Sequence, residues 1–476
     1  MSFKRILSNG AAAMTAALLL PGAAPADSLR EALLQTYRTN PLITGERAGL
    51  RALDEGVAIA RAGKRPQVSA IAGVNQDLIT SSDGLGRNFT AALDVSYPLF
   101  TGGRVGNRIR AAEERVEAGR ASLEDVEGDV FTLAVAAYMD VIRDRSVVAL
   151  NRNQVRVLEV NFEATSDRFE IGDVTRTDVA QSEARLALAQ SRLATAEGQL
   201  TASEEEYLRI VGSLPGDLEP PPPLPPLPDA PAEAVATALA ENPELDAIAA
   251  SIRAARRDVL VARADRLPTL DAVGSGNYQN FLGTADEQFA PGAPNSISST
   301  GVGVSARIPI YQGGVVGAQV RRAQALESQL LERSIGLERS VIAEVRAAFA
   351  SYEASSEAIE SNEIAVAANQ LALEGNRAEL TVGTRDVLDV LNAEQELLES
   401  QVALVTARRD FYVAGFRLLN AMGLADREDL NLDGGYIYNP VENYERVAGK
   451  ASDWSMDPRP EPQATRTGSV ERDDAN

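Results

Sequence analysis

Arg385, Asp389 and Asn392 form the group of polar residues whose spacing most clearly allows joint chemistry. Intervals of four and three residues place all three side chains on one face of a helix. For an arbitrary helix, the ordinary interpretation is a solvated face with a weak local ion pair. The chain contains no His and no Cys, which excludes imidazole bases, thiol nucleophiles and the usual zinc sites.

Several glycine pairs could suggest phosphate binding, but their surroundings argue against it. Gly301-Val-Gly303 lacks the third glycine of a dinucleotide-binding loop and lies inside a strand pattern. The other two pairs each follow a strand pattern and precede a long helical pattern, so we interpret them as strand-to-helix turns: Gly102-Gly103 and Gly313-Gly314. The sequence therefore predicts no enzyme, with no catalytic residue, cofactor site or metal site.

The two ends of the chain carry signals of their own. Residues 1–26 contain Lys4 and Arg5, an apolar run and an A-x-A pattern at Ala24 and Ala26, which predicts a signal peptide. Residues 451–476 are polar and aperiodic, so we expect a disordered tail. A net charge of −22 opposes nucleic-acid binding through phosphate repulsion.

The chain repeats itself at two constant offsets. Asn40-Pro41 matches Asn242-Pro243 at 202 residues, and Gly102-Gly103 matches Gly313-Gly314 at 211 residues. An insertion of about nine residues between the strands of the second copy accounts for the difference. We expect a first repeat over 27–219, a Pro-rich linker over 220–231, a second repeat over 232–424, and a C-terminal segment and tail over 425–476.

Each repeat contains two segments with strand periodicity. The segments cover about 67–80 and 89–100 in the first repeat, and 269–282 and 300–311 in the second. Apolar and polar residues alternate in them, as in Val302, Val304 and Ala306 against Gly303 and Ser305. Each segment approaches the ~10 residues that a tilted strand needs to cross a bilayer.

Long helices follow each strand pair. No proline occurs from Leu99 to Leu214 or from Ile310 to Asn439. Heptads of apolar residues begin at Ile109 and Val116 and shift by four residues near Val141. The expected helices cover about 104–171, 174–211, 315–382 and 385–421. The first would measure roughly 100 Å at 1.5 Å per residue.

Four strands cannot close a membrane barrel alone, because about eight is the minimum and an open edge leaves unpaired amides in lipid. Two copies would give a barrel filled by side chains, whereas three would give a water-filled lumen. The glycine-rich, polar inner faces favour three. The sequence thus predicts an α+β membrane protein: a trimeric 12-stranded β-barrel continued by a long coiled-coil helical tunnel.

The chain resembles the TolC family of outer-membrane efflux and secretion channels over nearly its whole mature length. The resemblance is carried by Tyr97-Pro-Leu-Phe-Thr-Gly-Gly103, by Ile308-Pro-Ile-Tyr-Gln-Gly-Gly314, and above all by Val382-Gly-Thr-Arg-Asp-Val-Leu-Asp-Val-Leu-Asn-Ala-Glu394. It implies a homotrimer in the outer membrane lipid, a tunnel in the periplasm, a periplasmic adaptor and an inner-membrane ABC or RND-type transporter. Tyr438-Asn-Pro-Val-Glu-Asn-Tyr444 is similar to a segment of members that serve type I secretion.

The resemblance also implies roles at the periplasmic tip. Helices would turn back at Gly172 and Gly383, and Asp389 and Asn392 would point into the tunnel as a constriction that attracts cations. Arg385 would tie the closed tip to residues of the first repeat, which are Thr177 and Asp178 here. Where family members often carry a second Asp, this chain has Asn392. A tyrosine of the family's hydrogen-bond network at the tip corresponds to Leu380 here.

Two questions stay open at the sequence level. The exported cargo could be drugs and other small molecules or secreted proteins, because one channel can serve both. The chain could also be an exported periplasmic coiled-coil structural or adaptor protein, which would be soluble rather than embedded in the outer membrane.

Overall fold

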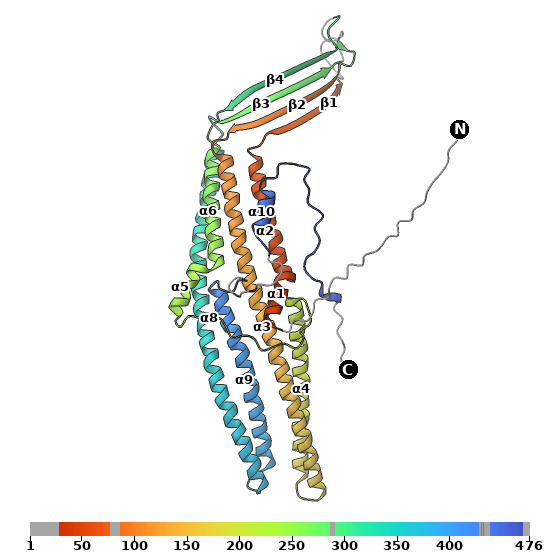
Figure 1. Ribbon diagram of the computed structural model, residues 1–476, viewed down its shortest axis with the longest axis vertical. Helices are drawn as coiled ribbons and strands as arrows, with labels where there is room; N and C mark the ends of the chain where they lie inside the picture. The colour runs from red at the N-terminus through yellow and green to blue at the C-terminus, as the bar shows by residue number, and fades with distance from the viewer. Residues whose placement is uncertain are drawn as a thin grey trace, which may run out of the picture.

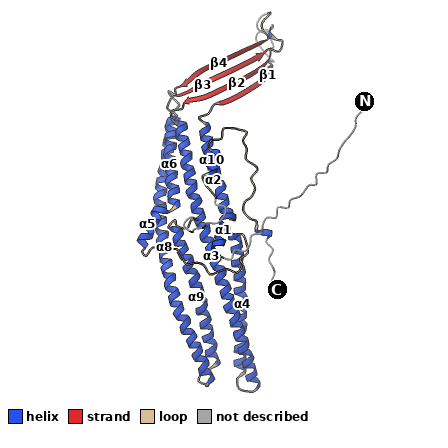
Figure 2. Cartoon of the chain, viewed as in Figure 1, coloured by secondary structure: helices blue, strands red, loops and turns tan. Residues whose placement is uncertain are grey.

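The protein is elongated, with a four-stranded sheet at one end and two helical hairpin tips at the other (Figure 1). The computed structural model describes residues 28–76, 86–285, 291–427, 430, 432 and 438–469. The expected signal peptide and the expected turn around Asp83-Gly84 lie outside these residues. Figure 2 shows that helices form nearly all of the body below the sheet.

Two repeats with the same order of elements make up the body. The first contains α1 (Leu29–Thr39), α2 (Pro41–Ala62), β1 (Gln67–Gln76), β2 (Arg87–Phe100), α3 (Arg104–Glu170) and α4 (Arg176–Val211). The second contains α5 (Pro231–Glu241), α6 (Pro243–Ala264), β3 (Thr269–Asn280), β4 (Ser296–Arg307), α8 (Val315–Thr381) and α9 (Val387–Ala421). The starts of the paired helices differ by the two expected offsets, so the internal duplication is confirmed.

Asn-Pro divides the short helices of each repeat at the same place. Asn40 ends α1, and its side chain accepts the backbone N–H of Leu42 in the first turn of α2. The same side chain donates to the carbonyl of Ile210 at 3.0 Å, and Asn242 does so to the carbonyl of Ala421 at 3.3 Å. The asparagine thus caps one helix and attaches it to the end of a long one.

The sheet is an antiparallel meander in the order β1-β2-β3-β4. Apolar residues gather on one side, where Val68, Ala70, Ala72 and Val74 lie opposite Val95, Leu93, Ala91 and Phe89. Polar residues gather on the other side, where Ser69 lies opposite Asp94 and Asp94 lies opposite Ser275. The alternation therefore gives one apolar and one polar face, as a membrane barrel requires.

The fourth strand differs from the expected 300–311. It begins at Ser296 and ends at Arg307, which pairs with Thr269, the first residue of β3. Residues 308–311 have no β3 residue left to pair with, and Pro309 has no N–H to donate. The extra residues of the second repeat fall in the connection 281–295, of which 286–290 lie outside the described residues.

The main hydrophobic core lies near the middle of the helical body, where short helices and the linker pack on the long ones. Phe131, Tyr138, Leu418 and Leu419 are among its fully buried side chains. Residues 220–230 of the Pro-rich linker have no helix or strand. Just before the linker, the Glu219 carbonyl accepts from the Tyr138 hydroxyl at 2.7 Å. Leu224 and Leu227 of the linker pack against this core.

The C-terminal segment returns to α2 and forms α10 (Glu442–Val447) beside it (Figure 1). Asn443 donates to the buried Asp54 at 2.7 Å, and Arg61 donates to the Tyr444 hydroxyl at 3.1 Å. Arg446 and Lys450 both bind Asp457, which lies in the segment from residue 451 onward for which the sequence predicts disorder. Residues 458–466 have no helix or strand before the short 3-10 helix η1 (Thr467–Ser469).

Across the described part of the chain, no helix combines the length and hydrophobicity that a membrane-spanning helix requires.

Candidate functional site at the helical tips

Two glycines reverse the chain at the ends of the long helices. Gly172 and Gly383 both have φ of +80°, a conformation that costs glycine little because it has no Cβ. The N–H of the residue after each glycine bonds back across the last helical turn, Asp173 to Arg168 and Thr384 to Glu379. These bonds have the pattern of a Schellman C-cap, so the turns need glycine for local backbone reasons.

A capping box begins each returning helix. The Asp178 carboxylate accepts the backbone N–H and the hydroxyl of Thr175, both at 2.8 Å. These two hydrogen bonds hold the pKa of Asp178 below its usual value. Asp389 accepts the backbone N–H of Asp386 at 3.4 Å. The T-x-x-D spacing could have revealed this local role from the sequence.

Arg385 binds residues of its own hairpin. Its Nε lies 2.7 Å from a Glu379 carboxylate oxygen, and its Nη1 lies 3.8 Å from an oxygen of Asp389. The Glu379 hydrogen bond is the main cause of a raised Arg385 pKa. Within the described chain, Arg385 does not reach Thr177 or Asp178. A single chain thus brings Arg385 and Asp389 together but leaves the first-repeat residues apart.

Asn392 has a partner that the sequence did not suggest. Arg185 of α4 donates to the Asn392 side-chain oxygen at 2.7 Å and to Gln395 at 2.7 Å. These bonds join α4 to α9, so they cross from one repeat to the other. No pattern announces this contact, because the partners are 207 residues apart.

A second polar link lies deeper between the hairpins. Glu394 is buried on α9 and accepts from Asn161 of α3 at 3.3 Å and from Arg377 of α8 at 2.9 Å. Its repeat counterpart Glu183 is exposed. The Glu394 carboxylate therefore connects three long helices, α3, α8 and α9.

The strand-to-helix turns are built alike but packed differently. Gly102 and Gly103 have φ of +62° and +81°, and Gly313 and Gly314 have φ of +61° and +83°. A Cβ on Gly102 would lie 2.7 Å from the Leu267 Cβ, whereas a Cβ on Gly313 would meet nothing within 4 Å. Gly102 thus packs closely on Leu267, just after α6, whereas Gly313 has open space in the single chain.

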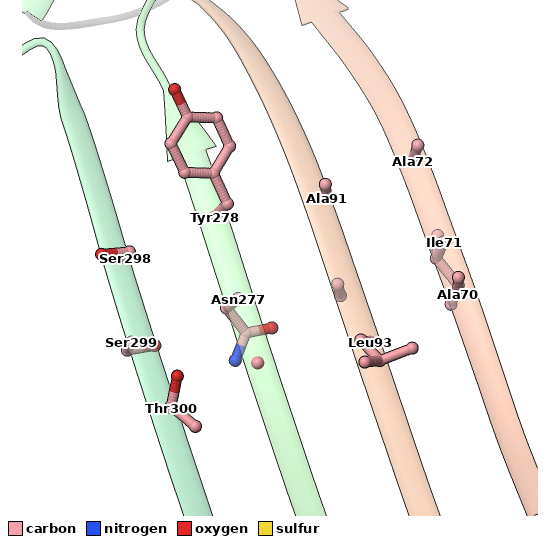
Figure 3. A pocket seen from close by; sticks show the side chains of 12 residues that line it. Ala70, Ile71, Ala72, Ala91, Leu93, Asn277, Tyr278, Ser298, Ser299 and Thr300 are labelled. Atoms are coloured by element: carbon pink, nitrogen blue, oxygen red, sulfur yellow. The ribbon is translucent and has the colours of Figure 1, made fainter.

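The sheet lies at the opposite end of the molecule from the helical tips (Figure 1). A shallow hollow on the sheet is lined from all four strands by small, apolar and amide or hydroxyl side chains, among them Leu93, Asn277 and Ser299 (Figure 3). Among the described residues, no group of three or more acidic side chains has the arrangement of a metal site.

Sequence and structure comparisons place these features in a known family. The profile of the family described as "Outer membrane efflux protein" matches residues 33–213 and 234–424. The chain is 34% identical to outer membrane efflux protein BepC of Brucella suis, over 92% of this chain and 95% of BepC. It is 28% identical to outer membrane protein TolC of Escherichia coli over 89% of this chain and 88% of TolC.

Further similarities extend to secretion proteins and to solved channels. The alkaline protease secretion protein AprF of Pseudomonas aeruginosa is 27% identical over 72% of each chain. The Campylobacter jejuni CmeC outer membrane channel superposes with a TM-score of 0.73 at 14% identity, over 88% of this chain and 89% of CmeC. The chain therefore belongs to the outer membrane efflux protein family, and it is an outer-membrane export channel of the TolC type, in which each chain gives four strands to a trimeric barrel and its helices to a periplasmic tunnel.

Proposed function

We propose that the trimer is the exit duct of a tripartite export system, which receives its cargo from an inner-membrane ABC or RND-type transporter through a periplasmic adaptor. The observation that carries this proposal is the length of α3 and α8, which have 67 residues each. At 1.5 Å per residue they extend about 100 Å from the sheet. A duct of that reach supports a connection to a pump rather than simple diffusion across one membrane.

Small-molecule efflux is the first candidate for the cargo. The relative BepC, named an efflux protein, aligns over 92% of this chain, whereas AprF, named for protease secretion, aligns over 72%. Deleting the gene should raise susceptibility to hydrophobic drugs and detergents, and the wild-type gene should restore resistance. Unchanged susceptibility together with loss of a secreted protein from the medium would favour protein secretion instead.

The tips supply the elements of a gate. Asp389 and Asn392 are proposed to form the constriction, and Arg385 is proposed to reach Thr177 and Asp178 of a neighbouring subunit in the closed trimer. This arrangement is supported by the exposure of Thr177 and by the free side of the Arg385 guanidinium, whose side chain is 48% exposed. Opening would separate the hairpins after the adaptor docks, because a packed bundle can rearrange when a few polar links break.

Single-channel recording tests the gate directly. Arg385→Ala and Asp178→Ala should each raise the conductance of the closed trimer, and unchanged conductance in both variants would contradict this assignment. Arg185→Ala should also ease opening, because it removes both of the hydrogen bonds from α4 to α9. Arg192→Ala is the matched control, since Arg192 lies two helical turns further on the same face and makes no ion pair among the described residues.

A further inference from the structure

The C-terminal segment carries the chain's single tryptophan on its surface. Trp454 is 91% exposed, and Met456, two residues later, is 86% exposed. Both lie in a stretch that has no helix or strand. Large apolar side chains gain free energy when they leave water. Two of them so close together therefore point to a partner that the single chain does not supply.

Arginines at the end of α2 hold this stretch beside the start of β1. Arg61 donates to the Ala448 carbonyl at 3.1 Å. Arg65 donates to the Lys450 carbonyl, and it lies two residues before Gln67, the first residue of β1. In Figure 1 the trace after α10 rises toward the sheet before it turns back. The C-terminal segment is thus attached to the point where the helical body meets the sheet.

Ion pairs close the stretch into a loop around Trp454. The Asp457 carboxylate accepts two hydrogen bonds from Arg446, both at 2.8 Å, and one from Lys450 at 3.1 Å. These bonds lower the pKa of Asp457 to about 2, so this carboxylate stays charged at neutral pH. Inside the loop, the Ser452 hydroxyl accepts the backbone N–H of Trp454 at 3.3 Å. Trp454 is therefore held in a closed loop rather than on a free tail.

The start of β1 marks the periplasmic edge of the barrel, because α2 leads into it and the helices continue into the periplasm. Val68 is the first β1 residue of the apolar face, which a membrane barrel turns to lipid. Tyr97 lies on this face one residue beyond Ser96, which is opposite Gln67, and it is 43% exposed. Tyr and Trp gather at the edges of the lipid because their rings have an apolar body and a polar group. The boundary between lipid and water thus passes near this level.

The loop and the first residues of β1 share one hollow. Val68 lines it from the strand, and Asp453 and Ser455 line it from the loop. These two loop residues flank Trp454 in the sequence, so the tryptophan lies beside a residue of the lipid-facing surface while its own ring stays uncovered. The loop therefore continues the surface by which the barrel meets the membrane.

We propose that residues 450–457 form a membrane anchor, in which Trp454 and Met456 insert among the headgroups of phospholipids in the periplasmic leaflet of the outer membrane. In this position the indole ring buries its apolar body and keeps its N–H near water or headgroup oxygens. The loop has one Lys and two Asp, and Arg446 beside it balances the charge. A zwitterionic phospholipid surface fits this neutral loop. The anchor depends on the barrel's place in the outer membrane and not on the proposed cargo or gate.

Tryptophan fluorescence tests the anchor without a label, because Trp454 is the chain's single tryptophan. The purified trimer is placed in nanodiscs of zwitterionic phospholipid that carries bromine either near the headgroup or near the ends of the acyl chains. Bromine quenches tryptophan only at close range. Bromine near the headgroup should quench Trp454 several-fold more strongly than deep bromine, and acrylamide in the water should quench it weakly. Quenching by acrylamide alone, or by neither reagent, would overturn the proposal, because Trp454 would then lie in water or under protein.

Two control variants move the tryptophan to other places. Trp454→Phe with Phe169→Trp places it near the end of α3, where Phe169 is 44% exposed, and there acrylamide but not lipid bromine should quench it. Trp454→Phe with Tyr97→Trp places it on the apolar face, where bromine near the headgroup should quench it. Both variants must run as trimers on an unboiled gel. Lipid quenching at position 169 as strong as that of Trp454 would overturn the proposal, since the contact would then be unspecific.

The ion pairs at Asp457 have a test of their own. Asp457→Asn should lower the quenching of Trp454 by headgroup bromine several-fold, because the loop is no longer closed, while the unboiled trimer persists. Asp453→Asn is the matched control, since it makes the same change of charge in the same loop and Asp453 has no ion pair in the described part of the chain. Equal quenching in the wild type and both variants would show that Asp457 does not hold Trp454 at the membrane.

Discussion

At the scale of single residues, the buried ion pair between α2 and α3 gives a sharper prediction than the residues at the helical tips. Arg47 and Glu127 form an ion pair at 3.3 Å with both side chains 6% exposed, and the Arg47 guanidinium also lies over the Tyr37 and Tyr438 rings. Burial raises the pKa of Glu127 to about 7, and Arg47 offsets only part of that rise. A single buried pair of this kind connects α2, α3 and the C-terminal segment.

The raised pKa makes stability depend on pH with a definite sign. Between pH 4.5 and about 7, the folded protein holds a proton on Glu127 that the unfolded chain has released. Stability from this group is therefore present below pH 4.5 and falls as pH rises to about 7, by on the order of 3 kcal/mol.

Thermal unfolding of the trimer should show the wild type losing stability relative to Glu127→Gln over this range. Glu163→Gln, an exposed change on the same helix, should follow the wild type. Parallel curves for wild type and Glu127→Gln would refute the prediction.

The limits of sequence reasoning at this scale have a physical cause. The turn glycines and Asp178 act through neighbours three to five residues away, so local patterns reveal their conformations. Arg185, Asn161 and Arg377 act through contacts that form only when long helices pack, and nothing in a local pattern encodes those distances. The assignment of Asp389 and Asn392 to a constriction came from family resemblance and stays a prediction.

At the scale of elements, the duplication made the helices predictable. Proline-free runs and constant offsets predicted α3 and α8 to within one or two residues of their observed bounds. The end of β4 could not be predicted, because a strand ends where its partner ends and β3 begins only at Thr269. The contacts at Asp457 were missed for a similar reason, since two cations from α10 and its C-terminal end fix a segment whose own composition predicts disorder.

The strand-to-helix turn offers a test at this scale. Gly102→Ala and Gly383→Ala both force alanine into positive φ, at a cost of about 1–2 kcal/mol. Only Gly102→Ala also drives a Cβ to 2.7 Å from the Leu267 Cβ, which should add about 1–3 kcal/mol. Thermal unfolding of the trimer should therefore show a larger loss for Gly102→Ala. Equal losses would mean that Leu267 moves aside at no cost and that the close packing of this turn is not structurally important.

At the scale of the whole molecule, the two halves are alike in plan but unlike in how they meet. Within a chain, α3 and α6 are joined by ion pairs such as Arg115 with Asp258 and Arg104 with Asp265. The repeat counterparts of these residues are Leu326 and Gly56 for the first pair, and Val315 and Gly63 for the second. The repeat counterparts of these two charged pairs are therefore an apolar residue and a glycine in each case. Trimer stability should consequently depend little on salt at these positions.

Substitution of Leu326 tests whether an apolar contact at this position holds the trimer together. Leu326 is 50% exposed in the single chain, and we expect a neighbouring subunit to cover it, as α6 contacts its repeat counterpart Arg115 through Asp258. Leu326→Glu should bury an unpaired charge there and sharply reduce the heat-modifiable trimer, whereas Leu326→Met should preserve it. Leu371→Glu is the matched control, because Leu371 is 71% exposed and its counterpart Val160 stays exposed even with its helical neighbours present. A gel comparison of boiled and unboiled outer membranes measures all three variants. If Leu371→Glu abolished the trimer while Leu326→Glu did not, the subunits would meet on a different face of α8.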